Sequence, residues 1–248
     1  MKKIVFLSIV FSYGLTLHAQ DWKADIEQAY AIFSEPNLEV EVEQLLYPSA
    51  AATVPVERET IYFARQGDKY RIRQYGTEFV SDGSYVVFVN TSAGIVAVKQ
   101  KETQQADTKP SEGMEILQQS IANLAKAYGL DTLQQQEQYT CSYLGEHNGT
   151  KSYRFDYAYG EYTQTTVYLS VKTGLLEQIS GVFRQAVEIE EGTKSQPRID
   201  FVYKRQSTGK DFDGSLFSIS GIIAFDAQGA VTLKEKYSNY RLLNNIRK

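Results

Sequence analysis

IYFARQGDKYRIRQYGTEFVSDGSYVVFVNTSAGIVAVK, residues 61–99, decides the fold of this chain, because it divides into short apolar stretches separated by turn residues. Glycine at 67 and 76 stands where a tight turn needs a positive φ. Asp82-Gly83 predicts a type I′ hairpin turn, in which both central residues have φ > 0. The stretch therefore predicts five adjacent antiparallel strands, at residues 61–65, 70–75, 78–81, 86–89 and 95–98.

The strand at 86–89 is apolar on both faces, so we expect it near the middle of the sheet, covered on each side. Gly181 is expected to mark a bulge or bend, and residues 188–197 read as a charged loop. Period-2 alternation and turn signals on either side of the opening stretch predict further strands at 37–46, 139–144, 152–157, 162–171, 175–187, 199–206, 216–225 and 231–237, with a final edge strand at 237–243.

Two helices are expected. Residues 21–33 place Trp22, Ile26 and Phe33 at helical spacing, which gives a face that can be buried against a sheet. Residues 111–128 carry a second apolar stripe of Met114, Leu117, Ile121, Leu124 and Tyr128. A helix lying across an open sheet can cover the core and roof a pocket at the same time.

The first nineteen residues read as a signal peptide. Two lysines precede an apolar run at 4–17, and Ala19-Gln20 suits cleavage. The run is too short for a membrane span, which takes about 20 apolar residues, and no cysteine follows the cut to accept a lipid anchor. We therefore expect one mature domain at 20–248, free in the periplasm and not an integral membrane protein.

Charge and cysteine content exclude some classes of protein. The chain has 30 acidic against 26 basic residues, so it lacks the basic footprint that nucleic-acid binding needs. Cys141 is the only cysteine, which excludes an internal disulfide. We expect it to be a small buried residue of a strand, with a reactive thiol as the alternative.

Catalytic chemistry finds little support, and we expect no enzyme, no cofactor and no metal. His147 is the only histidine beyond residue 18 and sits in a predicted turn. Asp211 and Asp213 resemble the start of a calcium loop, but the later acidic ligands are absent. A pair of facing carboxylates, as in glycosidases, is the remaining enzymatic alternative.

Aromatic residues stand out, with 18 Tyr and 12 Phe. Many occupy alternating strand positions: Tyr62, Tyr70, Phe88, Tyr153, Phe155, Tyr157 and Tyr162. They can form the cross-strand pairs of a large sheet. They can equally line a concave apolar surface that accepts a lipophilic ligand.

The opening stretch resembles the periplasmic lipoprotein carrier family LolA and its relative LolB. That family has an aromatic strand with an arginine, a second strand, and a Ser-Asp-Gly turn leading into an apolar strand. Residues 61–65, 70–72 and 79–88 match these elements in order, and residues 167–179 resemble a later hairpin of the family. Gln66 and Val87 stand where the family usually has Pro and Trp.

The resemblance implies an α+β fold, an incomplete antiparallel β-barrel of about ten to eleven strands covered on its concave side by helices. It implies a cavity for lipoprotein acyl chains or lipid, and partners among inner- or outer-membrane envelope proteins. Arg65 matches a family arginine that bonds to the lid backbone as a latch; pairing with Glu57 or Glu59 is its alternative. We expect the cavity lining to include Tyr62, Tyr70, Ile72, Phe79, Val87, Val89, Ile95, Met114, Leu117 and Ile121.

The leading functional hypothesis is a non-enzymatic carrier of a lipophilic ligand. The alternative is an interaction or structural module of an envelope assembly, in which the same fold has its cavity filled by its own aromatic residues.

Overall fold

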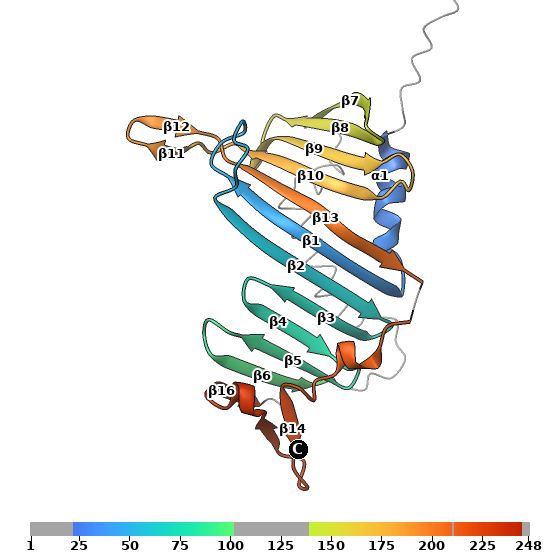
Figure 1. The fold of residues 1–248 in the computed structure, drawn as a ribbon, viewed down its shortest axis with the longest axis vertical. Helices are drawn as coiled ribbons and strands as arrows, with labels where there is room; N and C mark the ends of the chain where they lie inside the picture. The colour runs from blue at the N-terminus through green and yellow to red at the C-terminus, as the bar shows by residue number, and fades with distance from the viewer. Residues whose placement is uncertain (1–21, 102–138, 210, 245–248) are drawn as a thin grey trace, which may run out of the picture.

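The computed structural model describes residues 22–101, 139–209 and 211–244. They form a twisted sheet of twelve strands in the order β16-β6-β5-β4-β3-β2-β1-β13-β10-β9-β8-β7 (Figure 1). Neighbours are antiparallel except β16 and β6, and β7 and β16 stand at opposite edges, so the sheet is an unclosed barrel. Its strands are β1 (Asn37–Tyr47), β2 (Glu57–Gln66), β3 (Lys69–Gln74), β4 (Thr77–Ser81), β5 (Tyr85–Asn90), β6 (Ile95–Gln100), β7 (Tyr139–His147), β8 (Thr150–Tyr157), β9 (Tyr162–Ser170), β10 (Leu176–Phe183), β13 (Arg198–Thr208) and β16 (Arg241–Asn244).

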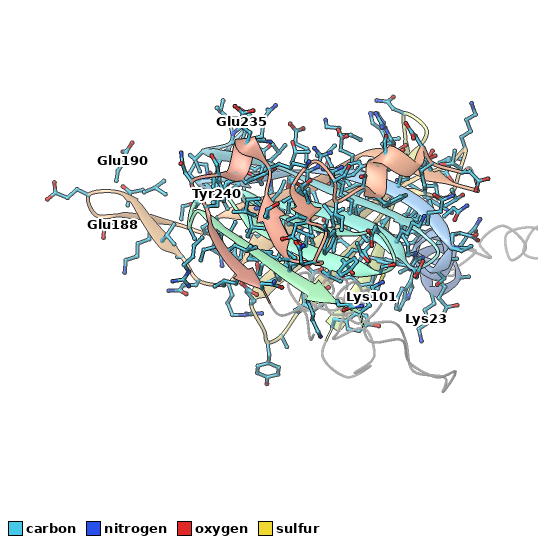
Figure 2. All side chains as sticks on the ribbon, turned by 90° about the horizontal axis from the view of Figure 1, so that it is seen from below. Lys23, Lys101, Glu188, Glu190, Glu235 and Tyr240 are labelled. Atoms are coloured by element: carbon cyan, nitrogen blue, oxygen red, sulfur yellow. The ribbon has the colours of Figure 1, made fainter. Side chains whose placement is uncertain are left out.

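The two faces of the sheet differ in what covers them. We call the inner face the one that carries α1 (Trp22–Ala31) and the turn η1 (Ile32–Ser34). The outer face of β2–β6 carries the C-terminal segment, which contains η3 (Gly214–Phe217), β14 (Ile223–Phe225), β15 (Val231–Leu233) and η4 (Glu235–Tyr237). Figure 2 shows the two sides, with Lys23 of α1 on one and Glu235 of η4 on the other.

The inner face of β7–β10 and β13 forms the larger core with α1. Ile26 and Ala29 of the helix are buried against it, and Trp22 makes an edge-to-face contact with Phe155 at 5.3 Å between ring centroids. The buried sheet residues of this core are Tyr153, Phe155, Tyr157, Tyr162, Val167, Leu169, Leu176, Ile179 and Phe201. The predicted amphipathic helix is therefore confirmed, and its apolar face is what fixes it to the sheet.

A second core seals the outer face of β4–β6. Valines of the three strands pack against isoleucines and Tyr237 of the C-terminal segment: Val80, Val87, Val89, Val96 and Val98 meet Ile219, Ile222, Ile223, Val231 and Tyr237. Phe217 closes the same face over Tyr62 and Ala64 of β2. The chain thus returns after β13 to cover the half of the sheet that it built first.

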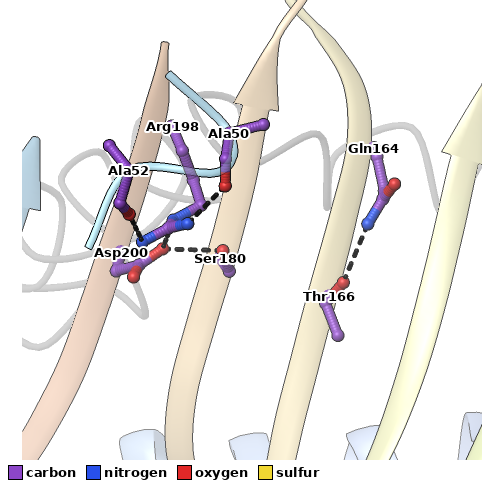
Figure 3. A network of polar contacts seen from close by, with 7 residues as sticks. All are labelled: Ala50, Ala52, Gln164, Thr166, Ser180, Arg198 and Asp200. Atoms are coloured by element: carbon purple, nitrogen blue, oxygen red, sulfur yellow. Dashed lines mark hydrogen bonds and ion pairs between the residues drawn. The ribbon is translucent and has the colours of Figure 1, made fainter. Parts of the chain in front are cut away.

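The outer face of β13 and β10 is polar instead. Arg198 pairs with Asp200 at 3.0 Å and donates to the backbone carbonyls of Ala50 and Ala52 (Figure 3). Asp200 also accepts from the hydroxyl of Ser180 at 2.6 Å. The network fixes the loop after β1 to this face. The buried carboxylate of Asp200 is paired with Arg198 and Ser180, so no unpaired charge is buried.

The five strands predicted at 61–99 are confirmed, but two details of the prediction are wrong. Asp82 does not have a positive φ; only Gly83 does, at 99°. The Asp82 carboxylate instead accepts from the backbone N–H groups of Ser84 and Tyr85, so the turn is built by the side chain. The strand at 86–89 lies third from the β16 edge and not near the middle of the sheet.

Two other predictions need correction. Residues 188–197 are not a plain loop, because β11 (Val187–Glu190) and β12 (Thr193–Ser195) form a hairpin that projects from the sheet (Figure 1). The strand predicted at 216–225 is the turn η3 followed by the three residues of β14. The irregularity expected at Gly181 lies next to it, since the register of β9 and β10 shifts between Val182 and Phe183; a Cβ at Gly181 would meet the ring of Tyr162 at 2.8 Å. The helix predicted at 111–128 lies outside the described residues.

Candidate functional site

An apolar row crosses the inner face of the first half of the sheet. Strand register places Phe63 opposite Ile72, Ile72 opposite Phe79, Phe79 opposite Phe88, and Phe88 opposite Ala97. The rings of Phe79 and Phe88 are in contact, with centroids 4.6 Å apart. We call these five residues the inner apolar row. Directly opposed apolar side chains of this kind form a continuous surface across β2–β6.

Four of the five row residues keep part of their surface accessible, whereas the valines on the other face of β4–β6 are closed off. Phe63, Phe79, Phe88 and Ala97 are half-buried. On the outer face, Val80 and Val87 are 0% exposed, because the C-terminal segment covers them. The contrast matters because contiguous apolar surface left partly open is a common property of ligand grooves.

The predicted lining residues fall on both faces. Tyr70, Ile72, Phe79 and Ile95 lie on the inner face, and their role in lining a cavity stays a prediction. Tyr62, Val87 and Val89 lie on the outer face, in the cores formed with the C-terminal segment, and so do not share a surface with the other four. Met114, Leu117 and Ile121 lie outside the described residues.

The predicted lining leaves out Phe63, Phe88 and Ala97, although the sequence places Phe88 among the aromatic residues that could line a concave surface. The alternation of side chains along a strand could have identified Phe88. Phe79 pairs with Phe88 across the Asp82-Gly83 turn, so Phe88 lies on the same face as Phe79 and Val87 lies on the opposite face. Because β5 carries apolar side chains on both faces, hydrophobicity alone did not show which face Val87 and Phe88 each occupy.

Arg65 joins the inner face of β2 to the end of α1. Its Nη2 donates to the backbone carbonyl of Phe33 at 3.1 Å and also to that of Glu35, while the side chain is only 4% exposed. Burial lowers the pKa of the guanidinium, and the charge of Glu35 opposes this shift. The alternative of pairing with Glu57 or Glu59 fails, since six residues of extended strand separate Arg65 from Glu59 by roughly 20 Å.

A second polar tie holds the other end of α1. The hydroxyl of Tyr153, which is fully buried, donates to Asp25, and Lys151 pairs with the same carboxylate oxygen at 2.6 Å. Burial acts to raise the pKa of Asp25, but the bonds from Lys151 and Tyr153 outweigh it and hold that pKa below its usual value. The helix is thus fixed by a carboxylate at one end and by Arg65 at the other.

Residues considered for catalysis lie apart from this surface. His147 is exposed at the end of β7. Asp211 accepts from Asn37 and Gln66, and Asp213 caps η3 by accepting from Ser215, which explains both carboxylates as structural. Within the described ranges there is no group of three His, Cys, Asp or Glu side chains placed to hold a metal.

Cys141 is partly buried at the edge of the larger core, as expected for a small strand residue. Burial raises the pKa of its thiol to about 11. The thiol is therefore protonated near neutral pH, which disfavours a nucleophilic role.

No helix of the described part of the chain is long and apolar enough to cross a membrane. No family model matches the sequence, and no curated protein matches it.

Several solved structures are similar in outline. An uncharacterized conserved protein from Thermus thermophilus is 7% identical over 92% of this chain and 100% of its own, with a TM-score of 0.41. A LolA superfamily protein from Nitrosomonas europaea is 10% identical over 79% and 96%, with a TM-score of 0.28. MucB of Pseudomonas aeruginosa, solved with MucA, is 13% identical over 80% of this chain and 59% of its own, with a TM-score of 0.39.

Proposed function

We propose that this protein is a non-enzymatic carrier that holds a lipophilic ligand, lipoprotein acyl chains or lipid, against the inner face of its sheet. The observation that carries the proposal is the inner apolar row, four of whose five residues are half-buried while the valines on the outer face of β4–β6 are sealed. Each methylene removed from water contributes about 0.8 kcal/mol, so an acyl chain laid along five strands offers ample driving force. The motif resemblance of residues 61–88 to lipoprotein carriers supports the same function.

Helix α1 is the element through which this binding would be controlled. It lies on the inner face beside the apolar row, and Arg65 fixes its C-terminal end through two backbone carbonyls. Breaking these bonds leaves the end of the helix held by the packing of Ile32 and Phe33 against β1, without disturbing the strand ladder. We propose that Arg65 acts as a latch, and that ligand entry or release accompanies its opening.

The place of action that fits such a carrier is the periplasm. The charged and apolar N-terminal segment supports export. The partners that we propose are the lipoprotein or lipid ligand itself and an envelope protein that delivers or accepts it.

One observation favours the alternative of an interaction module. The β11–β12 hairpin projects from the sheet, and Val187 and Ile189 on it are 42% and 41% exposed. Exposed apolar side chains on a protruding hairpin are suited to protein contact. In this alternative the inner face takes no ligand, so a binding measurement separates the two functions.

A fluorescent fatty-acid probe tests the carrier proposal. We expect saturable binding by the wild-type chain, and loss of at least about tenfold in affinity for Phe88→Asp, because a carboxylate in the row has to be desolvated. Tyr159→Asp is the matched control, since Tyr159 is 72% exposed in a turn. Equal binding by the wild type and both variants would remove the inner row as the site.

A further inference from the structure

A cavity lies on the outer face, away from α1 and the inner apolar row. It has a volume of about 790 Å³ and opens between β3, β4 and the C-terminal segment. The strands contribute Arg71, Arg73 and Glu78, and the segment contributes Lys236 and three serines. Figure 2 shows Glu235, the neighbour of Lys236, on the side of the sheet opposite Lys23 of α1. The cavity is therefore independent of the proposed carrier surface.

The cavity is cationic although the whole chain has a net charge of −4. Arg71 is neutralised by Glu78, with Nη2 2.6 Å from the carboxylate, and its Nη1 donates to the carbonyl of Leu216 at 2.9 Å. This pair fixes the floor of the cavity and joins the strands to the C-terminal segment. Glu78 is the only carboxylate among the lining residues, so it leaves the other two cations uncompensated.

Arg73 and Lys236 are those two cations. Both are exposed, and each lies over a tyrosine ring, Arg73 4.6 Å from the centroid of Tyr62 and Lys236 5.1 Å from that of Tyr237. Neither forms an ion pair with another residue that the structure describes. Contact with the rings restrains the two side chains without using their hydrogen-bond donors, which remain available to a ligand.

Hydroxyl groups and open space complete the site. Ser218 and Ser220 share one hydroxyl proton across 2.7 Å, which leaves the proton of the other hydroxyl for a ligand, and Ser215 on the same wall donates its hydroxyl to Asp213 at 2.8 Å. A Cβ built at Gly214 or at Gly221 would meet nothing within 4 Å, so these positions leave the cavity roomy. An arginine fork, an ammonium and serine hydroxyls are the donor set that matches a phosphate group.

We propose that this outer cavity binds a phosphate-bearing ligand, with Arg73 and Lys236 contacting the phosphate and the Ser218–Ser220 pair donating one hydroxyl to its oxygens. A free phosphate ion would fill only part of the volume, so the ligand is a phosphorylated small molecule or the phosphorylated head group of a lipid. Both sources present the same chemistry to the cavity.

Titration calorimetry at an ionic strength of about 0.1 M, where the Debye length is about 10 Å, tests this with inorganic pyrophosphate and glycerol 3-phosphate. Sedimentation with phosphatidylcholine vesicles, with and without phosphatidic acid, tests the lipid source. The full chain is compared with Arg73→Gln/Lys236→Gln and with the control Lys172→Gln/Lys194→Gln, which removes the same charge from exposed positions outside the cavity. A third variant, Gly221→Glu, adds a negative side chain where there is space for it.

We expect binding of a soluble probe, of the phosphatidic acid vesicles, or of both, weakened at least about tenfold by the cavity double variant and by Gly221→Glu. The control double variant should bind within about twofold of the wild type, because distant exposed charges are screened. Binding confined to the vesicles identifies a head group, and binding of the soluble probes identifies a small molecule. Equal losses in the cavity and control variants, or no binding of any probe, would overturn the proposal.

Discussion

The guanidinium of Arg65 on β2 donates to the backbone carbonyl of Phe33, 3.1 Å away, in the turn that follows helix α1. This bond crosses from the first half of the sheet to the helix that covers the second half. It supplies a charged donor to carbonyls at the end of a helix, where backbone acceptors lack partners within the helix. Arg65 thus links the inner apolar row to the element that borders it.

Replacing Arg65 by leucine should lower the free energy of unfolding by about 2–3 kcal/mol, because bonds from a buried cation to two carbonyls are lost. Denaturant unfolding measures the change. Hydrogen exchange should also accelerate in residues 30–36 before it does in the strands. Arg58→Leu is the control, since its side chain is 64% exposed in a surface ion pair with Glu43 and should cost less than about 1 kcal/mol. A loss no larger than that of the control would show that Arg65 does not hold the helix.

The Asp25 tie predicts a pH dependence. The pKa of Asp25 in the folded chain is below its usual value of 3.8, so its stabilising effect is present above that pH and is lost as the pH falls through the folded pKa. Wild type should therefore be more stable than Asp25→Asn near neutral pH, and the difference should shrink as the pH falls below 3.8 and through the folded pKa. Thermal unfolding of both proteins across this range checks it. A difference that persists unchanged in acid would contradict the assignment.

Tyr153→Phe tests the same tie without changing charge. It leaves the ring in the larger core and removes one buried hydrogen bond, for an expected loss of about 1–2 kcal/mol. Tyr143→Phe on the neighbouring strand is the control, because Tyr143 is 41% exposed. Equal stability of the two variants would mean that the Tyr153 hydroxyl does not contribute.

The two faces of β5 should respond differently to truncation. Val87→Ala empties space in the sealed outer core and should cost about 1–3 kcal/mol of stability without changing the binding of a fatty-acid probe. Phe88→Ala should weaken probe binding, since it removes a ring of the inner apolar row that lies between Phe79 and Ala97. Paired measurements of stability and affinity separate the effects. The reverse pattern would place the ligand surface on the outer face.

Cys141 should react slowly. A thiol whose pKa is about 11 has roughly 100-fold less thiolate at neutral pH than one at the usual 9.0. Alkylation by iodoacetamide should therefore be faster in denaturant than in the native chain by about that factor, and should rise steadily with pH up to 10. Fast native alkylation at pH 7 would indicate a reactive thiol instead.

Much of the fold could be predicted because it is local. The strands between Ile61 and Lys99 are delimited by Gly67, Gly76 and Gly94, which have positive φ in the structure, and their alternation gives each strand a buried side. Helix α1 and β1 follow from equally regular periodicity. The β11 strand was not predicted although Val187 and Ile189 alternate with glutamates, because it has only four residues, all of them exposed, within a charged stretch.

The C-terminal segment escaped prediction for a different reason. Residues 216–225 are apolar enough for a strand, but Asp213 caps a tight turn and Ser218 accepts from the N–H of Ser220, so local side-chain bonds replace a ladder. Which sheet face this segment covers depends on a long-range return of the chain. Where the C-terminal segment packs determines which face of β2–β6 is covered, and hence which of the predicted lining residues stay on the uncovered inner face.

Native mass spectrometry of the protein purified from the cells that make it tests the central claim most directly. The carrier account predicts co-purifying lipid or acylated protein on the wild type, retained by Tyr159→Asp and lost from Phe79→Asp and Phe88→Asp. Arg65→Leu should alter how much is retained. A wild-type chain that is consistently empty, and as stable as one saturated with lipid, would contradict the account and favour an interaction module.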